Sequence, residues 1–585
     1  MEDEFRSDTN PRSNVPFFND EASRRSQFKV IHRFADSYEI DVAHLLLTDD
    51  IADLLTLVNL EAHYRLFPGS IVPEGFPFSE QPTWIIPVVR DTQKATQGRT
   101  QVSGAQGYVS LVRDLVKSSG IYAIASLALP LVSLVLAPFL THSLSRSDYG
   151  ALVVLNTVIT LMTGITQLGL ISAVFRAYNY DYESRRDRLA VLSTTVVLLC
   201  VTSLPITLVV AMTAPWLASF LLGSSSYGVA VQVTALVVLV QNLTVPGFAW
   251  LRAENRAKFF STLSVINVLI TLGANVILVG IAHMGIIGSL LATGIGYAVV
   301  VICTLPLILL RAGFASRLDI TRNLLSFGIP LVFNSVSFWV LQLSDRYLLS
   351  RLGSLAQTAS YGVAYTLGGV LNAVIIAPFI LAWGTAAFAI AKREDAPQAF
   401  QLVFRWFSMI LLLASFAFAL IAIVVLDVLF PPSYHSAAPI IPIINLSITF
   451  YGIYYIFSVG AGVQRKNWFV ALVMMLSALV NVGCNIVLIP LYGSMGAALS
   501  TLIAYVFLAL LMYIVNQRIY PIPFEINIFA IGLLVGVAIY IGCSLLAQHQ
   551  TIYGACAVYV GSTVLYGGCL VLLGKIATRN HKSAQ

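Results

Sequence analysis

The sequence predicts an all-α polytopic membrane protein with fourteen transmembrane helices, arranged as two parallel six-helix lobes related by a pseudo-two-fold axis and two further helices. Three observations support this: few charged residues, fourteen apolar segments of spanning length, and motifs that recur six spans apart. We expect four regions: a cytoplasmic, partly disordered N-terminal region at 1–107, a first lobe at 108–310, a second lobe at 311–517, and two extra helices with a cytoplasmic tail at 518–585.

The composition excludes a chain that is surrounded by water on all sides. Hydrophobic residues make up 57% of the 585 residues and charged residues only 11%, whereas soluble domains carry roughly 25% charged residues. Residues 1–120 hold 12 basic and 17 acidic residues, and the remainder holds 22 and 11. The basic excess therefore lies in loops between apolar segments, which is typical of a membrane protein, and we expect no nucleic-acid partner.

The first 107 residues differ in character from the rest. Residues 1–30 are polar, which favours disorder. A helix is expected over 51–66, because apolar residues recur there at helical spacing, and the prolines between 73 and 87 break the chain into turns. This region has too little apolar core for an enzyme domain. We expect a docking or regulatory module that is dispensable for membrane insertion.

Fourteen apolar segments reach the length of about 20 residues that a helix needs to cross a bilayer. With the N-terminus placed in the cytoplasm, the inner loops hold 19 Lys and Arg residues, and the outer loops with the outer end of the seventh span hold three. Both chain ends are therefore expected in the cytoplasm. The segments are 121–140, 151–175, 191–212, 229–251, 259–280, 286–310, 325–349, 361–391, 406–430, 439–463, 468–490, 496–515, 526–547 and 552–573.

An internal repeat links the two lobes at a separation of about 210 residues, or six spans. Because six is even, the two copies point the same way, as in transporters built from parallel repeats. Chance similarity between glycine-rich membrane helices is the alternative. The matches are 284–297 with 492–505, Asn275 with Asn485, and Tyr149-Gly150 with Tyr361-Gly362.

Several short motifs occur in order at defined spans. They are Ser145-Arg146-Ser147-Asp148-Tyr149-Gly150, Leu168-Gly169-Leu170 with Ala173 and Arg176, Gly328-Ile329-Pro330 with Asp345-Arg346, Pro431-Pro432-Ser433-Tyr434, and the stretch from Asn485 to Ala498. Together they resemble the signature of the polysaccharide-exporter family. This is the O-antigen and exopolysaccharide flippase branch of the multidrug, oligosaccharidyl-lipid and polysaccharide exporter superfamily. The resemblance covers roughly residues 110–515.

That resemblance implies a flippase, not an enzyme. Such a protein moves polyprenyl-phosphate-linked oligosaccharide from the cytoplasmic to the outer leaflet for cell-surface polysaccharide biosynthesis, by alternating access between its two lobes. The resemblance also implies a polyprenyl pyrophosphate-linked substrate, contact with membrane lipid and with polysaccharide-assembly proteins, and a location in the inner (plasma) membrane.

Two other functions remain open. An ion-coupled multidrug antiporter of the same superfamily would need an intramembrane carboxylate, and the spans have almost none in their middles. A membrane glycan polymerase or ligase would need a large outer loop, whereas the longest outer loop lies near 213–228 and is short. The chain has no Walker motif, and its six cysteines lack the spacing of a metal site, so we expect no cofactor or metal.

The candidate substrate-binding residues are polar or aromatic side chains in or beside the spans. Adjacent helix positions differ by about 100°, so Asp345 and Arg346 are expected to face different ways. Arg346 would attract the phosphate near the outer mouth, because its planar fork donates paired hydrogen bonds, and Asp345 would hold a partner that closes the outward gate. Solvated ends or hydrogen bonds between helices are the competing roles. The candidates are Arg346, Asp345, Arg176, Asn334, Gln342, Asn372 and Trp339.

Overall fold

The computed structural model describes residues 132–254, 256–547 and 550–583. All regular structure in these residues is helical, which confirms the predicted fold class. Residues 1–107 lie outside the described residues, and the expectations for that region stay predictions.

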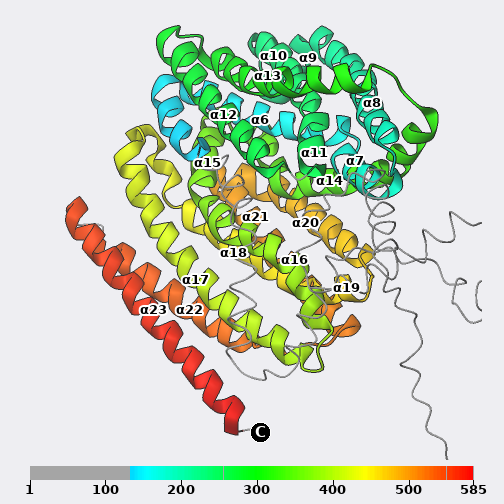
Figure 1. Cartoon of the computed structure of the whole chain (residues 1–585). Helices are drawn as coiled ribbons and strands as arrows, with labels where there is room; N and C mark the ends of the chain where they lie inside the picture. Colours follow the sequence, from blue (N-terminus) through cyan, green and yellow to red (C-terminus); the bar gives the residue numbers. More distant parts are fainter. Residues whose placement is uncertain (1–131, 255, 548–549, 584–585) are drawn as a thin grey trace, which may run out of the picture. The chain divides into compact units, whose positions relative to one another are not determined.

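The first group of helices, here called the N-terminal bundle, runs from residue 132 to residue 312. Within it α10 packs on α8 and α13, and α12 packs on α13 (Figure 1). Its members are the short helix Val132–Ser143, α6 (Arg146–Thr166), α7 (Leu170–Arg176), α8 (Arg185–Met212), α9 (Ala214–Leu222), α10 (Gly228–Leu243), α11 (Val245–Ala253), α12 (Ala257–Asn275) and α13 (Gly285–Ala312).

The second group, here called the C-terminal bundle, runs from residue 318 to residue 519. In it α21 packs on α18 and α20, and α14 packs on α20. Its members are α14 (Leu318–Leu352), α15 (Leu355–Gly368), α16 (Ala377–Ala391), α17 (Ala396–Leu429), α18 (Ile441–Phe457), α19 (Val459–Val463), α20 (Trp468–Tyr492) and α21 (Ser494–Ile519).

Two further helices, α22 (Ile526–Ala547) and α23 (Ile552–Ser583), lie side by side against α17 (Figure 1). An ion pair fixes the start of α22 to α17: the guanidinium of Arg405 donates two hydrogen bonds to the Glu525 carboxylate. Gln401, one turn earlier on α17, donates a third at 2.9 Å. The half-buried carboxylate thereby has a hydrogen-bond donor at each oxygen, which offsets the cost of removing its charge from water.

Twelve helices of the described residues are long and apolar enough to cross a membrane, and α14 adds a thirteenth if its two bent halves form one span. These thirteen correspond to the expected segments from 151–175 onward. The first expected segment, 121–140, begins outside the described residues, and only the short apolar helix Val132–Ser143 represents its second half. The count of fourteen and the symmetry between lobes therefore stay predictions.

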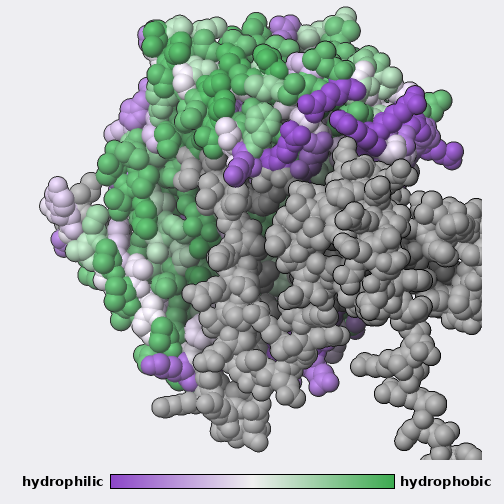
Figure 2. Space-filling view, in the orientation of Figure 1, coloured by the Kyte–Doolittle hydropathy of each residue, from purple (hydrophilic) through white to green (hydrophobic). Residues whose placement is uncertain are grey.

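Apolar side chains cover much of the surface of these helices. Figure 2 shows them over the N-terminal bundle, with hydrophilic side chains gathered beside α7 and α8. Large side chains such as Leu310, Leu318 and Met212 are 85%, 86% and 76% exposed. Together with the spanning length of the helices, exposed apolar surface on this scale is expected where the neighbouring medium is lipid.

The second expected span is broken in the structure. The sequence predicts one helix over 151–175, but α6 ends at Thr166 and α7 begins at Leu170. Leu168 and Gly169 both have positive φ, 50° and 66°, which no helix accommodates. The break lets this segment approach Gly328 of α14, where a Cβ on Gly169 would collide with the backbone.

The seventh expected span is also longer and bent. α14 extends from Leu318 to Leu352, and its halves Leu318–Val332 and Val336–Leu352 meet at 42°. Pro330 lies just before this bend, where it removes a backbone hydrogen bond and crowds the preceding turn. The bend directs the second half of α14, which carries Trp339 and Arg346, along α6.

Local geometry recurs at the positions of the internal repeat. Gly285, the first residue of α13, has a positive φ of 60°. Gly493, the residue just before α21, has a positive φ of 57°. Three residues later, Gly288 and Gly496 pack against the backbone of Leu278 and Leu488. Asn275 and Asn485 each donate to the carbonyl four residues earlier, at 2.8 and 2.9 Å. These shared local conformations agree with the expected repeat, and the symmetry of the whole lobes stays a prediction.

Candidate functional site

Two cavities lie between the bundles, one with the helix Val132–Ser143 and α6 on one side and α14 and α15 on the other, and a second between α6 and α14. The first, here called the arginine cavity, has a volume of about 370 Å³, and the second, the tryptophan cavity, has about 350 Å³. Thr160 lines both, so the cavities follow one another along α6. The arginine cavity is lined among others by Tyr149, Asn156, Thr157, Arg346, Tyr365 and Thr366, and the tryptophan cavity by Thr160, Thr163, Gln167, Val336, Phe338 and Trp339.

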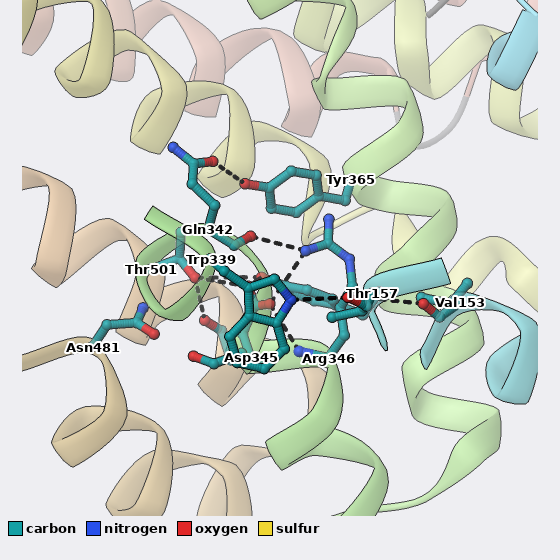
Figure 3. A network of polar contacts seen from close by, with 12 residues as sticks. Val153, Thr157, Trp339, Gln342, Asp345, Arg346, Tyr365, Asn481 and Thr501 are labelled. Carbon is teal, nitrogen blue, oxygen red and sulfur yellow. Dashed lines mark hydrogen bonds and ion pairs between the residues drawn. The ribbon is translucent and has the colours of Figure 1, made fainter. Parts of the chain in front are cut away.

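Arg346 supplies the positive charge of the arginine cavity. Its Nη1 donates to the Gln342 carbonyl at 2.9 Å and contacts Asp345 Oδ1 at 3.3 Å (Figure 3). Its guanidinium carbon lies 4.0 Å from the centre of the Tyr365 ring, a cation–π contact. Only 10% of the side chain is exposed. The guanidinium is thus held in one position by neighbours of its own bundle.

Asp345 is almost completely buried beside it, with 1% of its side chain exposed. Tyr361 on α15 donates a hydrogen bond to Asp345 Oδ2, and Thr501 on α21 donates another at 3.3 Å. Oδ1 accepts from the Arg346 backbone N–H at 2.8 Å. Each oxygen therefore has hydrogen-bond donors, which offsets the cost of burying the charge.

The expectation for this pair was partly wrong. The two side chains do start in different directions, but the Arg346 guanidinium folds back to contact Asp345. A long flexible side chain reaches across the 100° that separates adjacent positions, and burial favours that ion pair. The partners of Asp345 also belong to its own bundle. Asp345 therefore holds Tyr361 and Thr501 here, and its part in closing the outward gate stays a prediction.

Trp339 connects the two bundles between the cavities. Its indole Nε1 donates to the backbone carbonyl of Thr157 at 2.9 Å (Figure 3). Thr157 lines the arginine cavity and Trp339 lines the tryptophan cavity. The Trp339 ring consequently stands at the boundary between them.

The other predicted site residues divide into two groups. Gln342 joins the cluster, because its carbonyl accepts from Arg346 and its Oε1 accepts from the Tyr365 hydroxyl at 3.4 Å. Asn372 is half-buried at the start of a π-helical turn between α15 and α16 and lines neither cavity. The Asn334 side chain lies outside the described part of the chain.

Arg176 lies far from Arg346. Its guanidinium stacks 4.8 Å from the Phe327 ring and pairs with Asp181 at 3.5 Å. Phe327 precedes Arg346 by 19 residues on α14, which corresponds to about 28 Å of helix at most. One ligand group cannot bind both arginines, and the structure does not bring Arg176 into either cavity.

Sequence reasoning missed the row of threonines on α6. Thr157, Thr160 and Thr163 line the cavities, together with Asn156 and Gln167. Their spacing of three to four residues places them on one face of an otherwise apolar helix. That polar stripe is the signal that could have found them.

The motif around Arg146 joins the bundles at one end of the cavities. Arg146 Nη2 donates to Ser360 Oγ at 2.8 Å and to the Ala356 carbonyl at 3.3 Å, and its guanidinium lies 5.6 Å from the Tyr434 ring. Ser360 and Ala356 belong to α15, and Tyr434 to the turn after α17. The motif at 145–150 and the motif at 431–434 therefore contact each other across the two bundles.

A glycine contact joins the bundles at the other end. A Cβ on Gly169 would collide with the Gly328 carbonyl, and a Cβ on Gly328 would collide with the Leu168 carbonyl. Backbone thus meets backbone between α7 and α14. The two cavities lie between this contact and the contacts of Arg146.

Comparison with known proteins identifies the family. A family model described as "Polysaccharide biosynthesis protein" matches residues 139–439, just over half of the chain. The chain belongs to this family. The matched residues include Trp339, Arg346, Tyr365 and the whole polar face of α6, so the family model covers the polar lining of both cavities except Ser133.

A curated relative from the archaeon Methanocaldococcus jannaschii is an uncharacterised membrane protein. It is 26% identical over 188 residues, which are 32% of this chain and 37% of the relative. The chain thus matches little more than a third of the length of that relative.

Solved structures share the fold. The lipid II flippase MurJ in an inward-closed conformation has a TM-score of 0.64 at 13% identity, and the likeness covers 78% of this chain and 99% of MurJ. An inward-facing multidrug resistance transporter of the MATE family, from the MOP superfamily, has a TM-score of 0.55 at 14% identity, covering 68% and 97%. The family member described here is thus a multi-pass membrane protein with the fold of flippases and transporters of that superfamily.

Proposed function

We propose that the protein flips a polyprenyl-phosphate-linked oligosaccharide from the cytoplasmic to the outer leaflet for cell-surface polysaccharide biosynthesis. One observation carries the proposal. Arg346 lines a cavity between the two bundles, across from the amide and hydroxyl groups of Asn156, Thr157 and Thr160. Family membership supports a role in polysaccharide biosynthesis, and the likeness to a lipid II flippase supports a lipid-linked cargo.

Arg346 is suited to bind the phosphate of such a cargo. Its hydrogen bonds to Gln342 and Asp345 both leave from Nη1. A ligand in the arginine cavity would meet an edge of this planar fork, which matches two oxygens of one phosphate. The cation–π contact with Tyr365 and the ion pair with Asp345 keep that edge oriented before the ligand arrives.

The remaining polar groups suit a glycan. Hydroxyls and amides on α6 can donate to and accept from sugar hydroxyls, and the ring of Trp339 offers a flat apolar face for the carbon face of a sugar. The lining is otherwise apolar, with Leu136, Leu152 and Val153 among its members. This combination accepts a polar headgroup without holding it too tightly for release.

Alternating access follows from the contacts at the two ends of the cavities. Entry from one leaflet requires separation at Gly169 and Gly328, and exit to the other requires separation at Arg146 and Ser360. Separation at one end while the other end stays closed would let one bundle rock against the other about the cavities. We propose the inner (plasma) membrane as location, with both chain ends cytoplasmic, and polysaccharide-assembly proteins as partners.

An ion-coupled antiporter is the second candidate, because Asp345 is a buried carboxylate within a span. Groups of this kind bind coupling cations in membrane carriers. In the described residues its oxygens are already paired with Tyr361, Thr501 and Arg346. The flippase is preferred because a cation has to displace those partners, whereas Arg346 already faces the cavity.

Two measurements test the proposed function. Vesicles that contain the purified full chain should move a fluorescent polyprenyl-phosphate oligosaccharide between leaflets faster than protein-free vesicles. Deletion of the gene should leave glycolipid in the cytoplasmic leaflet. If the vesicles instead export only a cationic drug along a pH gradient, the antiporter is the right function.

A further inference from the structure

We propose that Thr160 selects the glycan, because its hydroxyl oxygen accepts a hydrogen bond from an unsubstituted sugar hydroxyl as the cargo passes. A cargo in which that sugar hydroxyl is replaced is then transported more slowly. The inference rests on the proposed function and adds to it a residue that determines specificity. It follows from the position of Thr160, from the direction of its own hydrogen bond and from its neighbour Asn156.

Thr160 lies where the two cavities follow one another. It lines both the arginine cavity and the tryptophan cavity. Its side chain is exposed, whereas Thr157 and Thr163 on the same face of α6 are only 3% and 6% exposed. Cargo that moves from one cavity to the other therefore passes Thr160, and the exposed side chain is open to contact with it.

The hydrogen bond of Thr160 within α6 leaves its oxygen as an acceptor. Oγ1 lies 2.9 Å from the Asn156 carbonyl oxygen. A carbonyl oxygen only accepts, so the hydroxyl of Thr160 supplies the hydrogen of this bond. A hydroxyl has one hydrogen and two lone pairs. With the hydrogen donated to the helix, the group is best suited to accept a hydrogen bond from a ligand.

Asn156 complements this acceptor from the same face of α6. It is four residues earlier, one helical turn away, and it is exposed and lines the arginine cavity. Its amide group carries both donors and an acceptor. A free sugar hydroxyl can donate to Thr160 and accept from Asn156 at once. An ether or ester oxygen at the same place can only accept, so it leaves Thr160 without a partner.

Paired substitutions in cells separate this role from packing. Thr160→Ser keeps the hydroxyl, whereas Thr160→Val keeps the shape of the side chain and loses the hydroxyl. At equal protein levels, in a strain that lacks its own copy of the gene, Thr160→Ser should export glycan at nearly the normal rate. Thr160→Val should export about fivefold more slowly. If Thr160→Val exports normally, or if Thr160→Ser is the slower variant, the inference is overturned.

Thr213 provides the matched control for these substitutions. Its hydroxyl donates to the Val209 carbonyl at 2.7 Å, and the side chain is exposed and lines neither cavity. Thr213→Ser and Thr213→Val should export glycan at the same rate. A loss in Thr213→Val as large as that in Thr160→Val would trace the effect to the helix and contradict the role of Thr160 in selection.

A set of lipids tests the selection directly. Vesicles with the full chain receive a polyprenyl diphosphate trisaccharide of neutral hexoses, or analogues in which fluorine replaces one hydroxyl at a time. Because fluorine donates no hydrogen bond, at least one analogue should flip about fivefold more slowly than the parent lipid. In Thr160→Val this difference should fall below about twofold.

The outcomes of this comparison keep the inference apart from the proposed function. Equal rates for the parent lipid and every analogue, or the same loss in the natural chain and in Thr160→Val, overturn the inference. Flipping of the parent lipid in those cases leaves the proposed function intact. If the parent lipid does not flip, the proposed function fails and the inference fails with it.

Discussion

The indole Nε1 of Trp339 donates a hydrogen bond of 2.9 Å to the carbonyl oxygen of Thr157, and this bond ties the C-terminal bundle to the N-terminal bundle. Because the donor and the acceptor belong to different bundles, the bond exists only while α14 lies against α6. It therefore favours the conformation in which the bundles are in contact around the two cavities. Trp339 also separates the two cavities. Whether its hydrogen bond to Thr157 is formed therefore affects the route of the cargo from one cavity to the other.

Trp339→Phe should loosen the contact between the bundles. The ring is retained and one hydrogen bond worth about 1 kcal/mol is lost, which shifts the population of the closed conformation by about fivefold. Distances between spin labels on α6 and α14 should broaden toward larger values. Trp383→Phe is the matched control, since Trp383 stacks on Phe379 within one bundle. Equal distance distributions in the two variants would refute the bridging role of Trp339.

Gly169→Ala should prevent closure at the α7 end of the cavities. Its Cβ would collide with the Gly328 carbonyl, and its φ of 66° disfavours any side chain. In a chain without native cysteines, Thr163→Cys in the tryptophan cavity should then react faster with a water-soluble maleimide. Gly273→Ala is the control, because a Cβ there meets nothing within 4 Å. An unchanged labelling rate in Gly169→Ala would show that this contact does not govern access.

Tyr361→Phe should destabilise the folded protein. The change removes a hydrogen-bond donor from the buried Asp345 carboxylate, which costs about 1–3 kcal/mol. The melting temperature in detergent should fall. Tyr434→Phe serves as control, because the Tyr434 hydroxyl is buried without a hydrogen-bond partner among the described residues. A fall of equal size in both variants would contradict the role assigned to Tyr361.

Single cysteines test the topology. A cysteine at Ser224, between α9 and α10, should react with an impermeant reagent added to intact cells. A cysteine at Ser184, just before α8, should react only after the membrane is permeabilised. The reverse pattern would place the basic loops outside and refute the orientation.

Much of the fold follows from hydropathy alone, because a lipid-facing helix must be apolar over about 20 residues. The segment 526–547 agrees with α22 at both ends. Breaks are harder to predict, since Leu168 and Gly169 adopt positive φ for a contact with Gly328, which is distant in sequence. The backbone preferences of residues 168 and 169 alone do not predict a contact with a residue so distant in sequence.

The candidate site was only partly predictable for a related reason. Of the residues predicted to bind substrate, Arg346 and Trp339 line the cavities and Arg176 does not, and the binding roles themselves stay predictions. Asn242 is as polar as Asn156, yet it is completely buried and donates to Thr166 and Ser203 inside its own bundle. Which face of a helix meets the cavity depends on packing between bundles, and the sequence of one span does not specify it.

The central claim is that the Arg346 guanidinium binds the phosphate of the cargo, and its most direct test is the flipping rate of Arg346→Lys and Arg346→Ala in vesicles. Arg346→Lys keeps the charge but loses the two-pronged edge, so the rate should fall about tenfold, and Arg346→Ala should fall further. Arg256→Ala is the control, because Arg256 pairs with Glu254 within the N-terminal bundle and lines neither cavity. Normal rates for both Arg346 variants, at normal protein levels, would contradict the account.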